Sequence, residues 1–268
     1  MKIYLIDEML YVNSRMIIDT HCHLFYPEIK NNLDEVLRQS EEMGVGQFIC
    51  VGTNLDDSRE CLILSETDTR IYGTAGIHPH DAKDAPEDYT DQICDLMSFE
   101  RMVACGEMGL DFFRNHSDPK VQERIFIEQI KLAQILEKPI IFHNRDADEA
   151  TIRVLNKNGN GNGVAHCFSS DLKTAQDFLD MGYYISFSGN LTFKNSHLPD
   201  IAKMIPLNRI LVETDSPYLS PVPFRGKPNI PGRTRLVAEK LAEIHHVSLE
   251  EISEKTSENT RKLFSLDA

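Results

Sequence analysis

The sequence predicts an α/β protein built as one (β/α)₈ TIM barrel over residues 16–268. Eight short β-like runs recur along the chain, and segments with helical spacing separate them. Most of the runs are continuously apolar, which is typical of parallel strands buried on both faces. A length of 268 residues suits one barrel or two ordinary domains. The eightfold alternation of strand and helix favours the barrel.

The expected strands are, in order, Met16–Thr20, Gln47–Val51, Ile71–Ile77, Met102–Glu107, Pro139–Phe142, Gly163–His166, Tyr183–Phe187 and Arg209–Glu213. The clearest helix between them is Asp118–Glu137, where apolar residues recur at helical spacing among charged and amide residues. Residues 1–15 precede the first run. Asp7 and Glu8 interrupt their apolar stretch, so we expect a short extension and not a signal peptide.

A doubly wound open sheet is the alternative fold, but it would need a glycine-rich turn after Met16–Thr20, and none is present. The glycine-rich segment Asn158–Gly163 precedes a strand, so it is expected to be a turn at the opposite end of the barrel from a site. The proline-rich segment Ser220–Pro231 follows the last strand. It lies on the face where barrel enzymes place their sites and could fold over a substrate.

The composition limits the possible partners and compartments. A formal net charge of −14 argues against a broad nucleic-acid-binding surface, although bound metals and a few arginines could supply local positive charge. The six cysteines form no C-x-x-C pair, which favours reduced thiols and a cytoplasmic location. No apolar stretch is long enough to span a bilayer, so no membrane partner is expected.

Six metal-ligand side chains end or follow predicted strands, as the C-terminal face of a barrel requires. They are His21, His23, Glu107, His143, His166 and Asp215. Strand alternation sends both members of the His-x-His pair to one face. Each residue alone has an ordinary interpretation, because histidines also cap strand ends and a buried glutamate can form an ion pair. Their common position indicates one divalent metal centre with nitrogen and oxygen ligands.

This set of motifs resembles the TatD family of metal-dependent deoxyribonucleases, within the amidohydrolase-like barrels. The matching segments include IDTHCHL, GIHPHD, GEMGLDFFRNHS, IIFHNRDADE, AHCFSS and LVETDSPYLSPVPFRGKPN. Two positions differ from the family pattern: Asn144 stands where a serine is usual, and Ile230 where a glutamate is usual.

The resemblance implies a site with two divalent metal ions, which could be Zn²⁺, Mn²⁺ or Mg²⁺. One ion would be held by His21, His23, Glu107 and Asp215, and the second would share Glu107 and add His143 and His166. Asp215 would also activate the attacking water. We further expect His78, Arg145 and Arg225 to contact a substrate phosphate.

The resulting hypothesis is hydrolysis of DNA phosphodiester bonds, with exonucleolytic trimming from the 3′ ends of single strands. An alternative is hydrolysis of an ester or amide, for example in an aminoacyl-tRNA. Many amidohydrolase-like barrels of that kind carry a carboxylated lysine as bridge, where this chain has Glu107. A non-catalytic, metal-stabilised scaffold is a third hypothesis, which the complete ligand set disfavours.

Overall fold

The computed structural model describes residues 16–266, and it confirms the (β/α)₈ barrel. One sheet contains eight strands in the order β1 to β8, and the strands from β3 to β7 pair in parallel. A parallel bridge between Cys22 and Ser216 joins the end of the first strand to the segment after the last. The strands are β1 Ile17–Cys22, β2 Val45–Cys50, β3 Ile71–Ala75, β4 Met102–Asp111, β5 Ile140–Arg145, β6 Gly163–Ala165, β7 Tyr184–Phe187 and β8 Ile210–Val212. Every predicted strand overlaps one of them.

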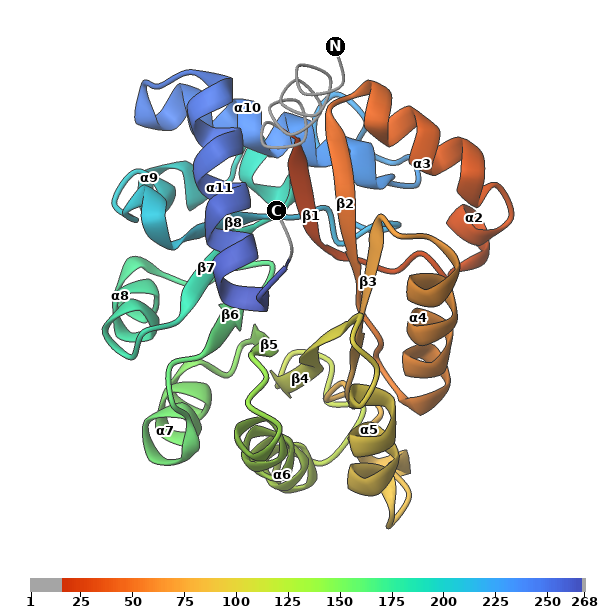
Figure 1. Cartoon of the computed structure of the whole chain (residues 1–268). Coiled ribbons are helices and arrows are strands. Elements are labelled where there is room, and N and C mark those ends of the chain that lie inside the picture. The colour runs from red at the N-terminus through yellow and green to blue at the C-terminus, as the bar shows by residue number, and fades with distance from the viewer. Residues whose placement is uncertain (1–15, 267–268) are drawn as a thin grey trace. The chain divides into compact units, whose positions relative to one another are not determined.

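The chain packs as two compact units, whose boundaries fall inside β2 and β7. One unit comprises the described parts of Met1–Phe48 and Phe187–Ala268, and the other is Ile49–Ser186. The helices of the first unit are α2 Pro27–Lys30, α3 Leu33–Glu42, η2 Gly189–Thr192, α9 Leu198–Ala202, η3 Leu207–Arg209, η4 Pro231–Arg233, α10 Thr234–His245 and α11 Leu249–Phe264. The helices of the second unit are α4 Leu55–Thr67, η1 Ala82–Asp84, α5 Tyr89–Met97, α6 Pro119–Ile135, α7 Asp148–Asn158 and α8 Leu172–Asp180. In the second unit each long helix follows its strand along the chain (Figure 1).

The core of the second unit is apolar and aromatic. Every residue of β4 is buried. The ring of Phe142 meets those of Phe178 and Tyr183 edge-on, with centroids 5.2 and 5.3 Å apart. The predicted helix at Asp118–Glu137 is confirmed as α6, which begins with proline at its first position and a capping bond from the Lys120 N–H to the Asp118 carboxylate. Burial on both faces of the strands explains their continuous apolar runs.

In the first unit the last helix, α11, fixes the amino ends of β1 and β8. Asn259 on α11 donates hydrogen bonds to the carbonyls of Leu207 and Ile210 at the start of β8. Ser257 on the same helix donates to the carbonyl of Met16, just before β1. These bonds satisfy backbone carbonyls at the ends of the strands opposite to those that carry the ligands.

The turn before β6 and the loop after β8 lie where the sequence predicts them. The glycine-rich segment 159–162 is the turn between α7 and β6, and 220–230 is a loop between β8 and η4. The predicted extension, residues 1–15, lies outside the described residues. All six cysteines are free thiols, and no helix in residues 16–266 combines the length and the apolar character that crossing a membrane demands.

Gln129 provides a stability test of how α6 holds the segment that follows β3. Its buried amide accepts a bond from the Ile77 N–H (2.8 Å) and donates one to the Ile77 carbonyl (3.0 Å). Gln129→Leu leaves both backbone groups buried without these bonds, so we expect unfolding to become easier by about 2–4 kcal/mol. Chemical denaturation measures this. Gln134→Leu, which removes only a solvent-exposed bond from the same helix to the Asn158 carbonyl, is the control, and equal effects of the two variants would contradict the prediction.

Candidate metal centre

All six predicted ligands lie at or beyond the carboxyl half of their strands, as expected. His21 is in β1 and His23 follows it, while Glu107 and His143 lie within β4 and β5. His166 is the residue after β6, and Asp215 is the third residue after β8. Within each of the two units, the candidate ligands lie toward the carboxyl-terminal ends of their strands.

In the first unit, His21, His23 and Asp215 form a compact group. The Asp215 Oδ1 atom lies 3.4 Å from His23 Nε2 and 3.9 Å from His21 Nε2. One ligand atom from each of the three residues lies within 4.8 Å of the other two. Both histidines are buried, and Asp215 is partly exposed. Two imidazoles and a carboxylate at this separation could hold a divalent cation.

Backbone bonds between the ends of β1 and β8 create this group. The Asp215 N–H donates to the His21 carbonyl, and the His23 N–H donates to the Ser216 carbonyl, each at 2.8 Å. Asp215 has a φ of 55°, a left-handed conformation that aspartate tolerates better than most residues. The bond from the Tyr218 N–H to the Asp215 carbonyl closes the turn that follows.

Asp19 in β1 also binds the segment after β8 that carries Asp215. Its buried carboxylate accepts bonds from the N–H and hydroxyl of Thr214, at 2.9 and 2.6 Å. Burial raises the pKa of Asp19 to about 8, against the lowering effect of the Thr214 bonds. Asp19 therefore fixes the position of the segment that carries Asp215.

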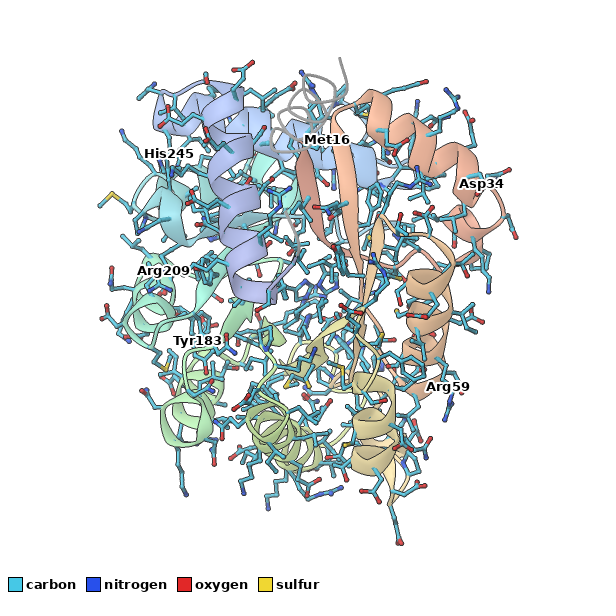
Figure 2. All side chains as sticks on the ribbon, in the orientation of Figure 1. Met16, Asp34, Arg59, Tyr183, Arg209 and His245 are labelled. Carbon is cyan, nitrogen blue, oxygen red and sulfur yellow. The ribbon has the colours of Figure 1, made fainter. Side chains whose placement is uncertain are left out.

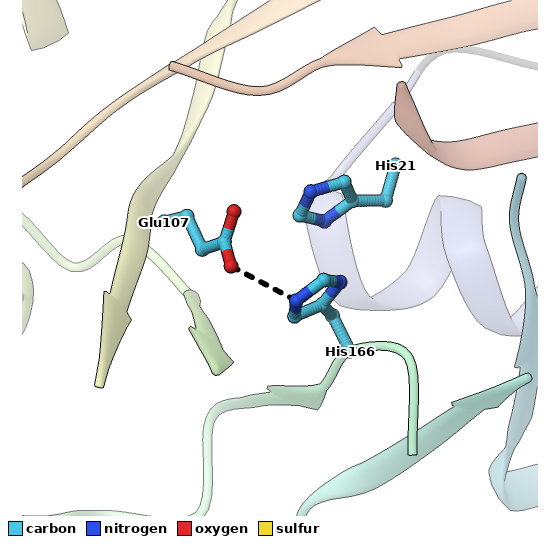
Figure 3. A group of neighbouring side chains, drawn as sticks. All are labelled: His21, Glu107 and His166. Atoms are coloured by element: carbon cyan, nitrogen blue, oxygen red, sulfur yellow. Dashed lines mark ion pairs between the residues drawn. The ribbon is translucent and has the colours of Figure 1, made fainter. Parts of the chain in front are cut away.

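In the second unit, three imidazole nitrogens converge on one oxygen of Glu107. The Oε1 atom lies 2.9 Å from His166 Nε2, 3.2 Å from His143 Nδ1 and 3.3 Å from His78 Nε2. Figure 3 shows the ion pair between Glu107 and His166. The prediction had placed His78 against a substrate phosphate, and the structure places its ring beside this ligand group. A bond from the His78 N–H to the Thr53 carbonyl helps hold it there.

Asp111 and His80 belong to the same cluster, and the sequence analysis missed both. Asp111 Oδ2 lies 2.8 Å from His80 Nε2 and 3.3 Å from His143 Nε2. An outer carboxylate of this kind orients a ligating histidine through the ring nitrogen that does not bind metal. One signal was available in the sequence, because His78-Pro79-His80 repeats the spacing of His21-Cys22-His23.

The charges in the second unit are strongly coupled. Burial opposes ionisation of Glu107, but the nearby imidazoles of His166, His78 and His143 hold its pKa well below the usual value. Burial lowers the pKa of His78 to about 4, so its ring is neutral at neutral pH. Burial also disfavours protonation of His143, yet its bonds to Asp111 and Glu107 raise its pKa.

These features fit a divalent cation. A neutral His143 that donates its Nε2–H to Asp111 turns the lone pair of Nδ1 toward the Glu107 oxygen, 3.2 Å away. The same Nδ1 lies 3.4 Å from His166 Nε2. Lone pairs that face one another need a proton or a cation between them. The carboxylates that raise the pKa of His143 would equally attract a metal ion.

The two arginines predicted to contact phosphate both lie over aromatic rings. The Arg145 guanidinium is 4.1 Å from the ring centroid of Phe113, and that of Arg225 is 3.6 Å from that of Phe193. Arg145 is the last residue of β5, and Arg225 lies in the loop after β8. Asn144, a residue that differs from the family pattern, bonds Asp148 at the start of α7 and Ser170 after β6, and so joins β5 to both segments.

Comparison with known proteins identifies the family. The model of the TatD related DNase family matches residues 18–265. The chain belongs to the TatD family. This TatD-family protein is 38% identical to YabD of Bacillus subtilis, described as an uncharacterized metal-dependent hydrolase, with 94% of this chain and 100% of the relative covered. It is 32% identical to a protein of Enterobacter lignolyticus named 3′-5′ ssDNA/RNA exonuclease TatD, with 92% and 98% covered.

A solved structure gives the same result for the fold. The crystal structure of YJJV, a TatD homolog from Escherichia coli, has a TM-score of 0.90 and 29% identity to the TatD-family chain, covering 95% of this chain and 100% of that one. Family, fold and ligand groups together make the protein a TatD-family metal-dependent hydrolase.

Proposed function

We propose that this protein is a 3′-5′ exodeoxyribonuclease that trims single strands at a dinuclear metal site. The observation that carries the proposal is the convergence of three imidazole nitrogens on Glu107 Oε1, within 3.3 Å. The group of His21, His23 and Asp215 supplies further ligand atoms. The proposal assigns one ion to His21, His23, Glu107 and Asp215, and a second to Glu107, His143 and His166.

Two bound divalent ions would supply charge stabilisation for the entering and leaving oxygens of a phosphodiester displacement. Asp215 accepts the proton of the attacking water, for which a partly exposed carboxylate is suited. The water oxygen forms a bond to the last phosphorus, the bond from phosphorus to the preceding O3′ breaks, and that O3′ takes up a proton from solvent to become the new 3′ hydroxyl. Asp111 holds the His143 ring in the orientation that ligation requires.

Three features support a nucleic-acid strand as the substrate. Arg145 is the last residue of β5 and Arg225 lies in the loop after β8, and both guanidinium groups could bind phosphate. A relative 32% identical over nearly its whole length is named as an exonuclease acting on single-stranded DNA and RNA. Glu107 stands where many amide-cleaving barrels use a carboxylated lysine.

We further propose, from the six free thiols, that the enzyme works in the cytoplasm.

The test compares 5′-labelled single strands with free and blocked 3′ ends, in Mn²⁺, Mg²⁺ or Zn²⁺ and in chelator. We expect a ladder that shortens from the free 3′ end, no shortening of blocked strands, and no activity in chelator. Release of internal fragments, or equal cleavage of blocked strands, would contradict the exonuclease assignment. If no metal supports nucleotide release while an ester or amide is cleaved, the alternative hydrolase function replaces it.

A further inference from the structure

The loop after β4 presents an aromatic ring with two guanidinium groups close to it. Phe113 is 54% exposed, so its ring is accessible to a ligand. The guanidinium carbon of Arg145 lies 4.1 Å from its ring centroid and that of Arg114 lies 5.5 Å from it. Both distances are in the range of cation–π contacts. We call Phe113, Arg114 and Arg145 the β4-loop cluster.

The guanidinium groups of Arg114 and Arg145 form no ion pair with a carboxylate in residues 16–266, unlike those of most other arginines. At least six arginines elsewhere form ion pairs with carboxylates: Arg38, Arg59, Arg70, Arg124, Arg153 and Arg235. One of them, Arg59, points outward from α4 (Figure 2). In a chain with a net charge of −14, this pairing pattern leaves two positive groups available for an anion.

The cluster is also held in place before any ligand arrives. The Arg114 N–H donates to Asp111 Oδ1 at 2.7 Å, and the Asn115 amide donates to the Phe112 carbonyl at 2.6 Å. The Phe112 N–H donates to the Arg145 carbonyl at 2.9 Å, which joins the loop to the end of β5. These bonds fix the turn that carries Phe113, so little ordering is needed on binding.

The cluster adjoins the metal-ligand group of the second unit. Asp111, two residues before Phe113, contacts His143 through its other carboxylate oxygen. Asp111 and Arg145 are also partners in the pairing of β4 with β5. Phe113 and Arg114 therefore lie in the loop directly after β4, and Arg145 lies two residues after His143 in β5, so the cluster borders the ligand group.

We infer that the β4-loop cluster is a binding subsite for one nucleotide of the substrate strand, with the base stacked on Phe113 and the adjoining phosphate bound by Arg145 and Arg114. Stacking on an aromatic ring tolerates any base, which suits an enzyme that trims strands of any sequence. Guanidinium groups near the ring give the phosphate a charged, bidentate partner. The inference rests on the proposed nuclease function and names residues that recognise its substrate.

The test combines Phe113→Leu with removal of single bases from the substrate. The probe is a short single-stranded DNA in which an abasic sugar replaces either of the last two nucleotides. We expect Phe113→Leu to raise KM about five- to tenfold, at the low end of base–aromatic stacking. An abasic sugar at one of the two positions should raise the KM of the unmodified enzyme similarly, and the two changes together should cost little more than either alone. Phe99→Leu, a 45%-exposed phenylalanine before β4, is the matched control.

The outcomes separate this inference from the proposed function. If the unmodified enzyme trims DNA and Phe113→Leu leaves KM unchanged, the subsite is wrong and the nuclease function stands. If the KM increases from Phe113→Leu and from an abasic sugar multiply at each of the last two nucleotides, neither base stacks on Phe113, which would also overturn the subsite. If no nucleotide is released, the proposed function fails, and the dissociation constant of the same strand in chelator decides the subsite: weaker binding by Phe113→Leu supports it, and equal binding overturns it.

The phosphate contact has its own readout. Arg145→Gln should make the plot of log K against log salt shallower by about 0.7, the value for one phosphate on a single strand. Arg153→Gln, whose exposed guanidinium pairs with Glu123 on α6, should leave the slope unchanged. An unchanged slope in Arg145→Gln would remove that residue from the subsite.

Discussion

Asp215→Asn is expected to lower kcat by about 10²–10⁴-fold while KM changes little. The amide keeps the size of the side chain and one oxygen, but it cannot accept the proton of the attacking water. The first-unit geometry supports this role, because Asp215 lies beside both His21 and His23 and is partly exposed. Steady-state trimming of a single-stranded oligonucleotide at saturating metal measures the effect.

Two controls make that result specific. Asp200→Asn, an exposed change on α9, should retain full activity. Elemental analysis of Asp215→Asn shows whether metal is retained, which separates lost basicity from lost ligation. Turnover close to that of the unmodified enzyme would show that another group takes the proton.

Glu107→Gln is expected to remove metal from both proposed sites and to lower activity by more than about 100-fold. This loss exceeds the roughly 10- to 100-fold that is typical when a residue that only hydrogen-bonds to a metal ligand is changed. The neutral amide preserves volume at a buried position but loses the charge that three imidazoles surround. His143→Ala should empty mainly one site, because in the proposed scheme it binds a single ion.

The measurement is metal content per chain after dialysis against Mn²⁺, with thermal unfolding to confirm the fold. Glu100→Gln, an exposed change just before β4, is the control. Retention of two ions by Glu107→Gln would contradict the bridging role, whatever its activity.

The barrel and the ligand groups were predictable from the sequence because each rests on a local pattern. Continuous apolar runs marked the strands, and the ligand side chains interrupted or followed those runs. The length of β4 was not predictable in the same way. Gly106 and Gly109 resemble strand breakers, yet the strand continues through both to Asp111. A Cβ atom at Gly109 would lie 2.1 Å from the His143 carbonyl, so this glycine permits close approach of β4 to β5.

The consequences of that longer strand depend on tertiary structure. Because β4 reaches Asp111, its carboxylate meets His143 and His80, and the loop beyond it presents Phe113. The contact between Asp19 and Thr214 was likewise not predictable, because the two residues are 195 positions apart in the chain. Sequence spacing identifies candidate ligands. Which groups lie beside those ligands and orient them depends on the register of neighbouring strands.

A metal titration followed by nucleotide release tests the central claim most directly. Metal-free protein receives Mn²⁺ in substoichiometric steps, and each step is assayed for bound metal and for shortening of a 5′-labelled single strand from its 3′ end. The dinuclear account predicts that trimming rises steeply as the second ion per chain binds. Full trimming at one ion per chain would contradict the dinuclear site, and no trimming with both ions bound would contradict the nuclease.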